Sequence, residues 1–223
     1  MSVMNNESSV VESIESILNQ TYENFEFLIL DDFSNDDTFK IIKEYEKTDD
    51  RIKIFKNNKN LGLTKSLNIL ISNTKGSLIA RQDGDDFSYR NRFKKQIYYF
   101  QTSDFDFCVS RATTKQSGKV LPKFSYYIPP ALVSNFKNPF VHGTLMIKKN
   151  TLLEIGSYNE SYYYAQDFKL FKDLLNKNKK FKYIKEPLYR LNTLNNISTL
   201  KKIEQDFYSN LVKRNQHPTK LIK

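Results

Sequence analysis

The chain has 223 residues, and its 35 Lys and Arg against 25 Asp and Glu give a formal net charge of +10. This length is typical of one large domain or two small ones, and 14% aromatic residues exclude a mainly disordered chain. No apolar run approaches the ~20 residues of a membrane-spanning helix, and the single cysteine, Cys108, excludes an internal disulfide. Residues 1–9 lack the features of a signal peptide, so we expect a cytoplasmic protein.

The charges are unevenly distributed along the chain. Basic residues gather in the segments 169–185 and 201–223, whereas carboxylates gather around residues 31–37 and 83–86. A basic protein has three candidate partner classes: nucleic acid, an anionic membrane surface or an anionic small substrate. Clustered carboxylates disfavour duplex DNA, so we expect no nucleic-acid partner. The basic runs are either a solvated surface or a contact for anionic lipid or polysaccharide.

The first half alternates between strand-like and helix-like segments. Helical periodicity, or short β-prone runs between polar turns, marks each segment. This alternation predicts an α/β fold with a parallel sheet. The predicted helices are 8–18, 37–46, 63–72 and 92–100, and the predicted strands are 25–30, 51–55, 78–80 and 105–109.

The second half is less regular, and it contains no repeat and no clear linker. We therefore expect one continuous domain. The predicted features are a hairpin turn at 117–118, a loop over 125–139, strands at 140–148 and 181–184, and helices at 167–176 and 200–214.

Two acidic clusters follow predicted strands directly. Asp31 and Asp32 end one strand, and the run 83–86 (DGDD) follows another. Ligands of doubly wound sheets bind at the carboxyl ends of the strands, so these clusters are expected to face one cleft. Crowded carboxylates repel unless a cation offsets their charge, and Mg²⁺ sites use one or two carboxylates with phosphate oxygens. The alternative is an Asp-rich turn that only aids solubility.

Four blocks in a fixed order carry a resemblance to a known family. They are residues 11–22 (VESIESILNQTY), 25–38 (FEFLILDDFSNDDT), 57–68 (NNKNLGLTKSLN) and 75–86 (KGSLIARQDGDD). Together they resemble a family 2 glycosyltransferase of the GT-A fold, closely to about residue 110 and more loosely to about residue 200. The resemblance implies a Rossmann-like, mostly parallel central sheet flanked by helices, with a smaller acceptor-side β region.

The resemblance also implies an activity. Such enzymes transfer a sugar with inversion from a nucleotide-diphosphate sugar, here expected to be a UDP-sugar, with the help of Mn²⁺ or Mg²⁺. The expected acceptor is a glycan or a lipid-linked hydroxyl in surface polysaccharide or lipopolysaccharide biosynthesis. A single domain over 1–223 would hold a nucleotide-sugar half (1–110), an acceptor half (111–199) and a basic helix and tail (200–223). That tail is expected to allow peripheral contact with an anionic membrane at its inner face.

Site residues follow from the resemblance position by position. Asp32 corresponds to the residue that binds the nucleotide base, with Asp31 in support. Asp83 and Asp85 match the D-x-D motif, with Asp83 near the ribose and both available to the metal. Gly84 between them would allow close approach to the backbone. The other expected nucleotide-sugar contacts are Val3, Met4, Glu7, Lys65 and Arg81.

The expected general base lies in the second half. Asp167 resembles the Asp of the family's Glu-Asp motif at a helix start, although Gln166 replaces the usual Glu. A positioned carboxylate accelerates removal of an acceptor proton by typically ~10²–10⁴-fold. The alternative is a helix-starting Asp that the helix dipole favours. Other acceptor-side candidates are His142, Gln166 and Tyr164, whose ring either stacks on a sugar or packs in the core.

Two further departures from the family pattern matter. Met4 replaces a Tyr at the end of the first strand, which is expected to be short or missing, and Asn192 stands where a His is common. A catalytically degenerate relative that only binds a nucleotide-sugar or a partner is therefore an alternative. A nucleotidyltransferase would need a Gly-rich phosphate loop with an early Lys, and a receiver-like phosphoacceptor would need a later Thr and Lys. Neither pair is evident.

Overall fold

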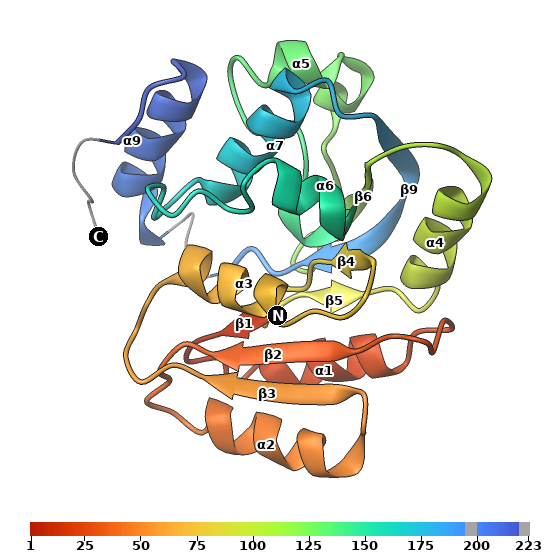
Figure 1. Cartoon of the computed structure of the whole chain (residues 1–223), viewed down its shortest axis with the longest axis vertical. Helices are drawn as coiled ribbons and strands as arrows, with labels where there is room; N and C mark the ends of the chain where they lie inside the picture. Colours follow the sequence, from red (N-terminus) through yellow and green to blue (C-terminus); the bar gives the residue numbers. More distant parts are fainter. Residues whose placement is uncertain (195–199, 219–223) are drawn as a thin grey trace.

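The computed structural model describes residues 1–194 and 200–218, and it contains two sheets surrounded by helices (Figure 1). A three-stranded sheet has the order β1-β2-β3, and a six-stranded sheet has the order β4-β8-β6-β9-β5 with β7 added to β6. The predicted mixture of helices and strands is confirmed. None of the helices within these residues is long and apolar enough to cross a membrane.

The three-stranded sheet is wholly parallel. β1 (Ser2–Val3) and β3 (Ile52–Lys56) flank β2 (Phe27–Asp31). Every residue of β2 is buried, as expected for a parallel strand covered on both faces. Helices α1 (Val10–Leu18) and α2 (Thr38–Thr48) pack against one face, and α3 (Leu63–Ser72) packs against the other.

The six-stranded sheet is mixed, and here the strand order could not be foreseen. β4 follows α3 but pairs antiparallel with β8, whereas β6 pairs in parallel with the much later β9. Helix–strand alternation correctly placed the elements, but it did not determine these partners. The strands are β4 (Leu78–Ala80), β5 (Phe87–Ser88), β6 (Phe107–Thr114), β7 (Val120–Leu121), β8 (Met146–Lys148) and β9 (Phe181–Leu191).

Two predicted elements of the second half need correction. Residues 140–148 were expected as one strand, but a 3₁₀ turn (His142–Thr144) precedes β8, and Thr144 Oγ1 donates to Val141 O over 2.7 Å. β9 was expected to end at residue 184, where a charged pair and a proline interrupt the apolar pattern. The strand instead continues through a register shift between Ser110 and Arg111 of β6, which accommodates the extra residues as a bulge.

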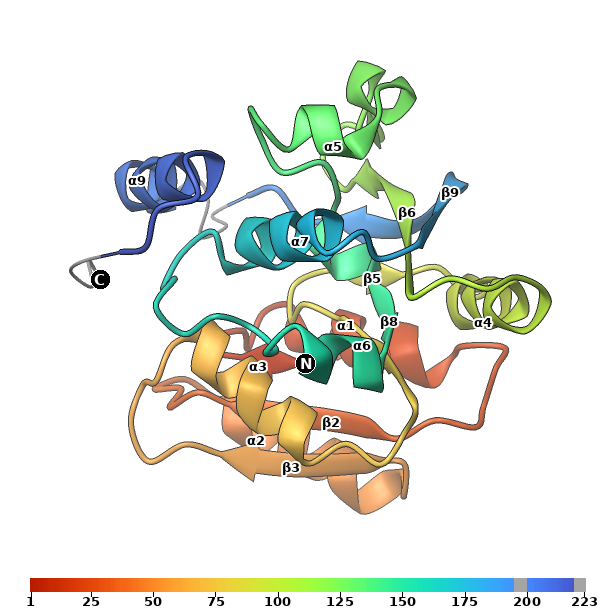
Figure 2. The same ribbon diagram turned by 45° about the horizontal axis from the view of Figure 1, so that its top comes forward.

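Helices complete the second half (Figure 2). The predicted loop over 125–139 contains a short helix, α5, and the predicted C-terminal helix is present as α9. α9 packs on α7 through Tyr208 and Val212. The largest apolar cluster draws side chains from both halves of the chain, including Ile14, Phe93 and Met146. The helices are α4 (Arg92–Thr102), α5 (Pro130–Val133), α6 (Lys149–Glu154), α7 (Gln166–Asn176) and α9 (Lys202–Lys213).

A fully buried arginine holds the loop after β4. The Arg92 guanidinium donates to Arg81 O and Ser88 Oγ, both over 2.8 Å, and its Nε donates to Gln96 over 3.0 Å. Burial lowers the pKa of Arg92 to about 10, so it stays protonated at neutral pH. The acceptors of these bonds are all neutral. Hydrogen bonds, rather than an ion pair, therefore offset the free energy needed to bury the guanidinium charge.

We predict that Arg92→Met destabilises the protein by about 3 kcal/mol, because several buried acceptors lose their donor together. Urea denaturation monitored by circular dichroism measures this change. The exposed neighbour Arg90 is the matched control, and Arg90→Met should change stability by at most about 0.5 kcal/mol. Equal effects of the two substitutions would contradict the role given to Arg92.

Candidate active site

Three carboxylates crowd the loop between β4 and β5. Asp83, Asp85 and Asp86 come from four consecutive residues, and Asp86 is almost fully buried at 6% exposure. Burial, followed by the charge of Asp83, raises the pKa of Asp85 to about 6. Burial and the same neighbouring charges raise the pKa of Asp86 well above its ordinary value. Burial and like charges thus oppose ionisation of the carboxylates in this loop.

Part of this charge is balanced from within the protein. The Arg81 guanidinium forms an ion pair with the Asp83 carboxylate, and Asn192 N donates to Asp86 Oδ1 over 2.6 Å. Backbone contacts fix the loop further, since Tyr189 Oη accepts from Asp83 N at 3.1 Å and Ser13 Oγ donates to Asp83 O at 2.7 Å. Asp83 remains 27% exposed, so its carboxylate stays accessible from the solvent side.

Gly84 is required for a different reason from the one that the sequence suggested. A Cβ at this position would lie 2.7 Å from Val3 Cγ1 and 3.1 Å from Asn6 Oδ1. The end of β1 thus occupies the space that a Cβ at residue 84 would need. Val3 is 2% exposed, and its side chain packs against the acidic loop at Gly84.

Asp167 lies at the start of α7, in its first turn. Asn138 Nδ2 donates to Asp167 Oδ2 over 2.8 Å, and burial raises the pKa of the carboxyl. Ala165, the residue before α7, has φ = +53°, an uncommon left-handed conformation for a residue with a side chain. Such backbone outliers cluster at functional sites, where the surrounding structure holds them in place.

The acidic loop and the start of α7 belong to one electrostatic neighbourhood. Burial is the main cause that raises the pKa values of Asp167 and Tyr158, and the charge of Asp83 adds to it in both cases. Asp167 also raises the pKa of Tyr158, against the opposing charge of Arg81. The sequence separates these groups by more than 70 residues, yet the fold brings them within mutual influence. This juxtaposition is what a site with a metal-binding side and a base-bearing side requires.

His142 lies beside this neighbourhood and is uncharged. Its Nε2 shares a 2.6 Å hydrogen bond with Tyr158 Oη, and burial followed by the nearby Arg81 lowers its pKa to about 3. His142 is therefore a neutral hydrogen-bonding group at pH 7, whereas Arg81 is a cation that pairs with the acidic loop directly.

Asp32 and Asp31 organise the end of β2. Asp32 accepts from Asn57 Nδ2, Leu61 N and Gly62 N at 2.8–2.9 Å, which ties β2 to the loop before α3. Asp31 is fully buried, and its Oδ1 has no hydrogen-bond partner in the part of the chain that the structure describes. Among the described residues, the hydrogen bonds of the two carboxylates run to Ser34 and to the segment 57–62 rather than to the acidic loop.

Several other residues that the sequence predicted for the site make no described contact with the acidic loop, and lie on the surface or pack in the core. Glu7 accepts from Asp37 N over 3.0 Å at the start of α2, Met4 is 41% exposed, and Lys65 is exposed on α3. Tyr164 is 8% exposed and packs against Tyr208 of α9, with ring centroids 6.1 Å apart. Gln166 is buried at the start of α7. Of the two alternatives for the Tyr164 ring, stacking on a sugar or packing in the core, the structure shows packing.

Sequence reasoning missed three residues that hold the site. Tyr189 and Asn192 reach the acidic loop from β9 and the residues after it, and Asn138 reaches Asp167 from a loop. These contacts join residues 29 to 106 positions apart. The position of Asn192 was noticed only as a departure from the family pattern, and nothing local marks Asn138 or Tyr189.

The side chains of the acidic loop are chemically suited to bind a divalent cation. Carboxylate oxygens are hard ligands suited to Mg²⁺ or Mn²⁺, and a cation would relieve the repulsion that raises the pKa of Asp85. Within residues 1–194 and 200–218, no three His, Cys, Asp or Glu side chains are grouped as a ready-made metal site. Mg²⁺ sites commonly take one or two carboxylates from the protein and the remaining ligands from substrate phosphates and water.

Known proteins resemble this chain in sequence. Residues 1–159 match the family described as Glycosyl transferase family 2. A putative glycosyltransferase, EpsE, of Bacillus subtilis is 35% identical over 165 residues, which cover 71% of this chain and 58% of that protein. The O-antigen biosynthesis glycosyltransferase WbnJ of Escherichia coli is 33% identical over 171 residues, covering 74% of this chain and 65% of that protein. The chain thus spans about three fifths of the length of these relatives.

Solved structures resemble the fold. S. aureus TarS (residues 1–349) in complex with UDP has a TM-score of 0.74 at 16% identity, covering 96% of this chain and 68% of that one. The mannosyltransferase PcManGT from Pyrobaculum calidifontis, in complex with GDP-Man and Mn²⁺, has a TM-score of 0.75 at 15% identity, covering 97% and 64%. These likenesses support the GT-A fold, and the sequence match shows that the chain belongs to glycosyltransferase family 2.

Proposed function

We propose that this chain transfers a sugar from a nucleotide-diphosphate donor, expected to be a UDP-sugar, to a hydroxyl acceptor with inversion. The observation that carries the proposal is the Asp167 carboxyl at the start of α7, which Asn138 holds through a 2.8 Å hydrogen bond and which lies near enough to the acidic loop for the charge of Asp83 to add to the effect of burial on its pKa. Inversion needs the attacking hydroxyl and the leaving diphosphate on opposite sides of the sugar. Carboxylates on two sides of one site, one set crowded and one isolated, fit these two tasks.

The donor side is assigned to the nucleotide-sugar half, residues 1–110. Asp85 and Asp83 are the proposed ligands of Mn²⁺ or Mg²⁺, and such an ion, when bound, neutralises charge on the leaving diphosphate. Solved relatives of the same fold bind UDP, or GDP-Man with Mn²⁺, which supports a metal-assisted nucleotide donor. The ion pair with Arg81 fixes the position of the Asp83 carboxylate.

The acceptor side is assigned to residues 111–199. Asp167 is the proposed general base, because its carboxyl is held by Asn138 and its pKa is raised by burial. A carboxylate whose pKa is raised towards 7 is a stronger base, so it accepts a proton from an alcohol more favourably. His142, as a neutral partner of Tyr158, is proposed to line the acceptor side.

Asp167→Asn is expected to lower kcat for sugar transfer by ~10²–10⁴-fold, since the amide cannot accept the proton. UDP affinity should change little, because the donor side is intact. Single-turnover transfer assays and calorimetric titration of UDP measure the two quantities. Asp173→Asn on the same helix, where Asp173 pairs with Lys169, is the control and should keep kcat. A full-rate Asp167→Asn enzyme would exclude Asp167 as base, and UDP binding without turnover in the parent would indicate a degenerate relative.

Asp85→Asn is expected to abolish the Mn²⁺-dependent part of UDP binding while raising the thermal stability of the metal-free protein. The stability should rise because a carboxylate whose folded pKa is raised to about 6 is destabilising above that pH. In the parent, Mn²⁺ affinity should fall as pH drops below about 6, because Asp85 becomes protonated. Thermal-shift assays with UDP, with and without Mn²⁺, from pH 5 to 8 measure both effects. Asp104→Asn, at an exposed carboxylate, is the control.

The acceptor is proposed to be carried at an anionic membrane surface, as a lipid-linked glycan. Two exposed apolar surfaces support this contact. One is on α9, the helix that the sequence suggested, where Ile203 is 84% exposed. The other is the aromatic segment, residues 124–136, with Phe124 at 84% and Phe136 at 76% exposure. The aromatic segment lies within residues 107–153, which include seven Lys and Arg but no Asp or Glu.

An apolar surface without acidic residues fits the interface of an anionic bilayer, where aromatic side chains insert and basic ones meet the headgroups. The double substitution Phe124→Ser with Phe136→Ser should reduce co-sedimentation with phosphatidylglycerol vesicles by about tenfold. Leu153→Ser, at a 48% exposed residue on α6, is the control. Binding that is insensitive to these changes, or to the anionic lipid content, would contradict the membrane contact.

A further inference from the structure

A buried tyrosine of β9 contacts both halves of the chain at the site. Tyr189 has 0% exposure, and it lies 106 positions after Asp83 in the sequence. Its hydroxyl reaches the acidic loop, and its ring reaches the 3₁₀ turn His142–Thr144 that precedes β8. One side chain thus connects the loop that carries the crowded carboxylates with the turn that carries His142.

The hydroxyl of Tyr189 binds the acidic loop at two points. It accepts a hydrogen bond from Asp83 N over 3.1 Å, so its own proton remains available for a second partner. That partner is the Asp86 carboxylate: burial and the neighbouring charges raise the pKa of Asp86, and a hydrogen bond from Tyr189 opposes the rise. The two bonds lie on either side of Asp85, so they restrict how the segment between them can move.

The Tyr189 hydroxyl keeps its proton at neutral pH. Burial, followed by the charges of Asp86 and Asp83, raises the pKa of the phenol well above its ordinary value. The group is therefore a neutral donor and acceptor. It adds no further charge to a loop that already holds three carboxylates.

The ring of Tyr189 lies directly against Gly143 in the turn. A Cβ at residue 143 would lie 2.4 Å from Cε1 and Cζ of the ring and 2.5 Å from Oη, so any side chain there must displace the tyrosine. Gly143 is not among the glycines with positive φ, so the position needs the space and not the backbone freedom of glycine. The preceding residue, His142, shares its hydrogen bond with Tyr158.

Arg92 joins the same two segments through their backbone. Its guanidinium carbon lies 5.0 Å from the centre of the Tyr189 ring, within the range of a cation–π contact. Its Nη2 donates to Arg81 O over 2.8 Å and to Leu145 O over 3.3 Å. The ring therefore packs against a cation that itself holds the start of the acidic loop and the end of the turn.

We propose that Tyr189 is a positioning residue that sets the acidic loop relative to the turn His142–Thr144, so that metal binding depends on the contact between its ring and Gly143. This role rests on the proposed function, in which Asp83 and Asp85 bind a divalent cation. Metal ligands must lie within about 0.5 Å of the productive geometry, and the groups behind them supply that precision. Phenylalanine would fill the same space but would leave Asp83 N without its acceptor.

A second tyrosine on the same strand provides a matched control. Tyr183 also belongs to β9, and its hydroxyl oxygen is buried without a hydrogen-bond partner among the described residues. Tyr183→Phe therefore breaks no hydrogen bond that the structure shows, whereas the same chemical change at Tyr189 breaks two. The two variants differ in the bonds lost and not in the atoms removed.

Tyr189→Phe should raise the Mn²⁺ concentration needed for half-maximal UDP binding by about tenfold, because the loop loses two hydrogen bonds together. Saturating Mn²⁺ should restore UDP binding, since both carboxylate ligands are still present. Calorimetric titration of UDP at a series of Mn²⁺ concentrations measures both effects. Tyr183→Phe should keep the Mn²⁺ requirement of the parent. A loss of UDP binding that is equal at every Mn²⁺ concentration would indicate a purely structural role and overturn the proposal.

Gly143→Ala tests the ring contact without changing the acidic loop. The added methyl must move the Tyr189 ring and its hydroxyl, so the Mn²⁺ requirement should rise as it does in Tyr189→Phe. Gly76→Ala is the control, because the atom nearest to its Cβ would be Leu78 O at 3.4 Å. In the double variant at 143 and 189 the two effects should add incompletely, since both act through one hydroxyl. Fully additive effects would contradict this link.

Amide exchange at Asp83 provides a readout that needs no ligand. Exchange should be about tenfold faster in Tyr189→Phe and in Gly143→Ala than in the parent, and unchanged in Tyr183→Phe. Equal exchange in all four proteins would overturn the proposal. A parent that shows no Mn²⁺-dependent UDP binding would contradict the proposed function, and exchange at Asp83 would then still decide whether Tyr189 positions the loop.

Discussion

The site depends on how three neighbouring carboxylates are held together after β4. Burial, followed by their mutual repulsion, raises the pKa values of Asp85 and Asp86, and the buried guanidiniums of Arg81 and Arg92 help to hold the loop. Arg81 pairs with a carboxylate directly, whereas Arg92 binds the backbone behind the loop. Holding the carboxylates in this geometry lowers the stability of the protein. A cation bound together with a diphosphate would reduce the repulsion between them.

The second half of the chain is what turns this loop into a two-sided site. Tyr189 and Asn192 fix the acidic loop from β9, and Asn138 orients Asp167. The parallel strands alone would supply neither set of contacts, and Asp32 at the end of β2 binds the loop before α3 instead. The arrangement belongs to a GT-A fold in a chain of glycosyltransferase family 2.

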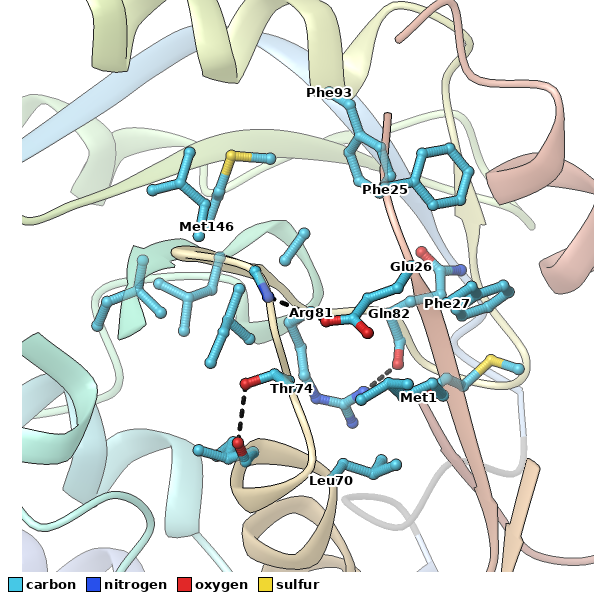
Figure 3. Close-up of a pocket in the computed structure, with 18 of the residues that line it drawn as sticks. Met1, Phe25, Glu26, Phe27, Leu70, Thr74, Arg81, Gln82, Phe93 and Met146 are labelled. Carbon is cyan, nitrogen blue, oxygen red and sulfur yellow. Dashed lines mark hydrogen bonds between the residues drawn. The ribbon is translucent and has the colours of Figure 1, made fainter. Parts of the chain in front are cut away.

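The end of β1 and the acidic loop are linked through one residue. Val3 ends the short strand β1 and packs on Gly84, so the strand that ends the parallel sheet also supports the acidic loop. A cavity of about 640 Å³ lies next to this region (Figure 3), and Arg81 and Gln82 of the acidic loop's start line part of it.

The sequence by itself determined the local features: helix 63–72, strand 78–80, the acidic strand ends and the helix that begins beside Asp167. Apolar periodicity and polar strand ends are short-range signals, so they can be read without the fold. Tertiary structure alone decided that β4 pairs with β8, that β9 passes a bulge beyond Lys185 and that Val3 explains Gly84. It also placed Tyr164 against α9 and made His142 neutral by burying it. These outcomes depend on contacts between residues far apart in the chain, and such contacts leave no local pattern in the residues that make them.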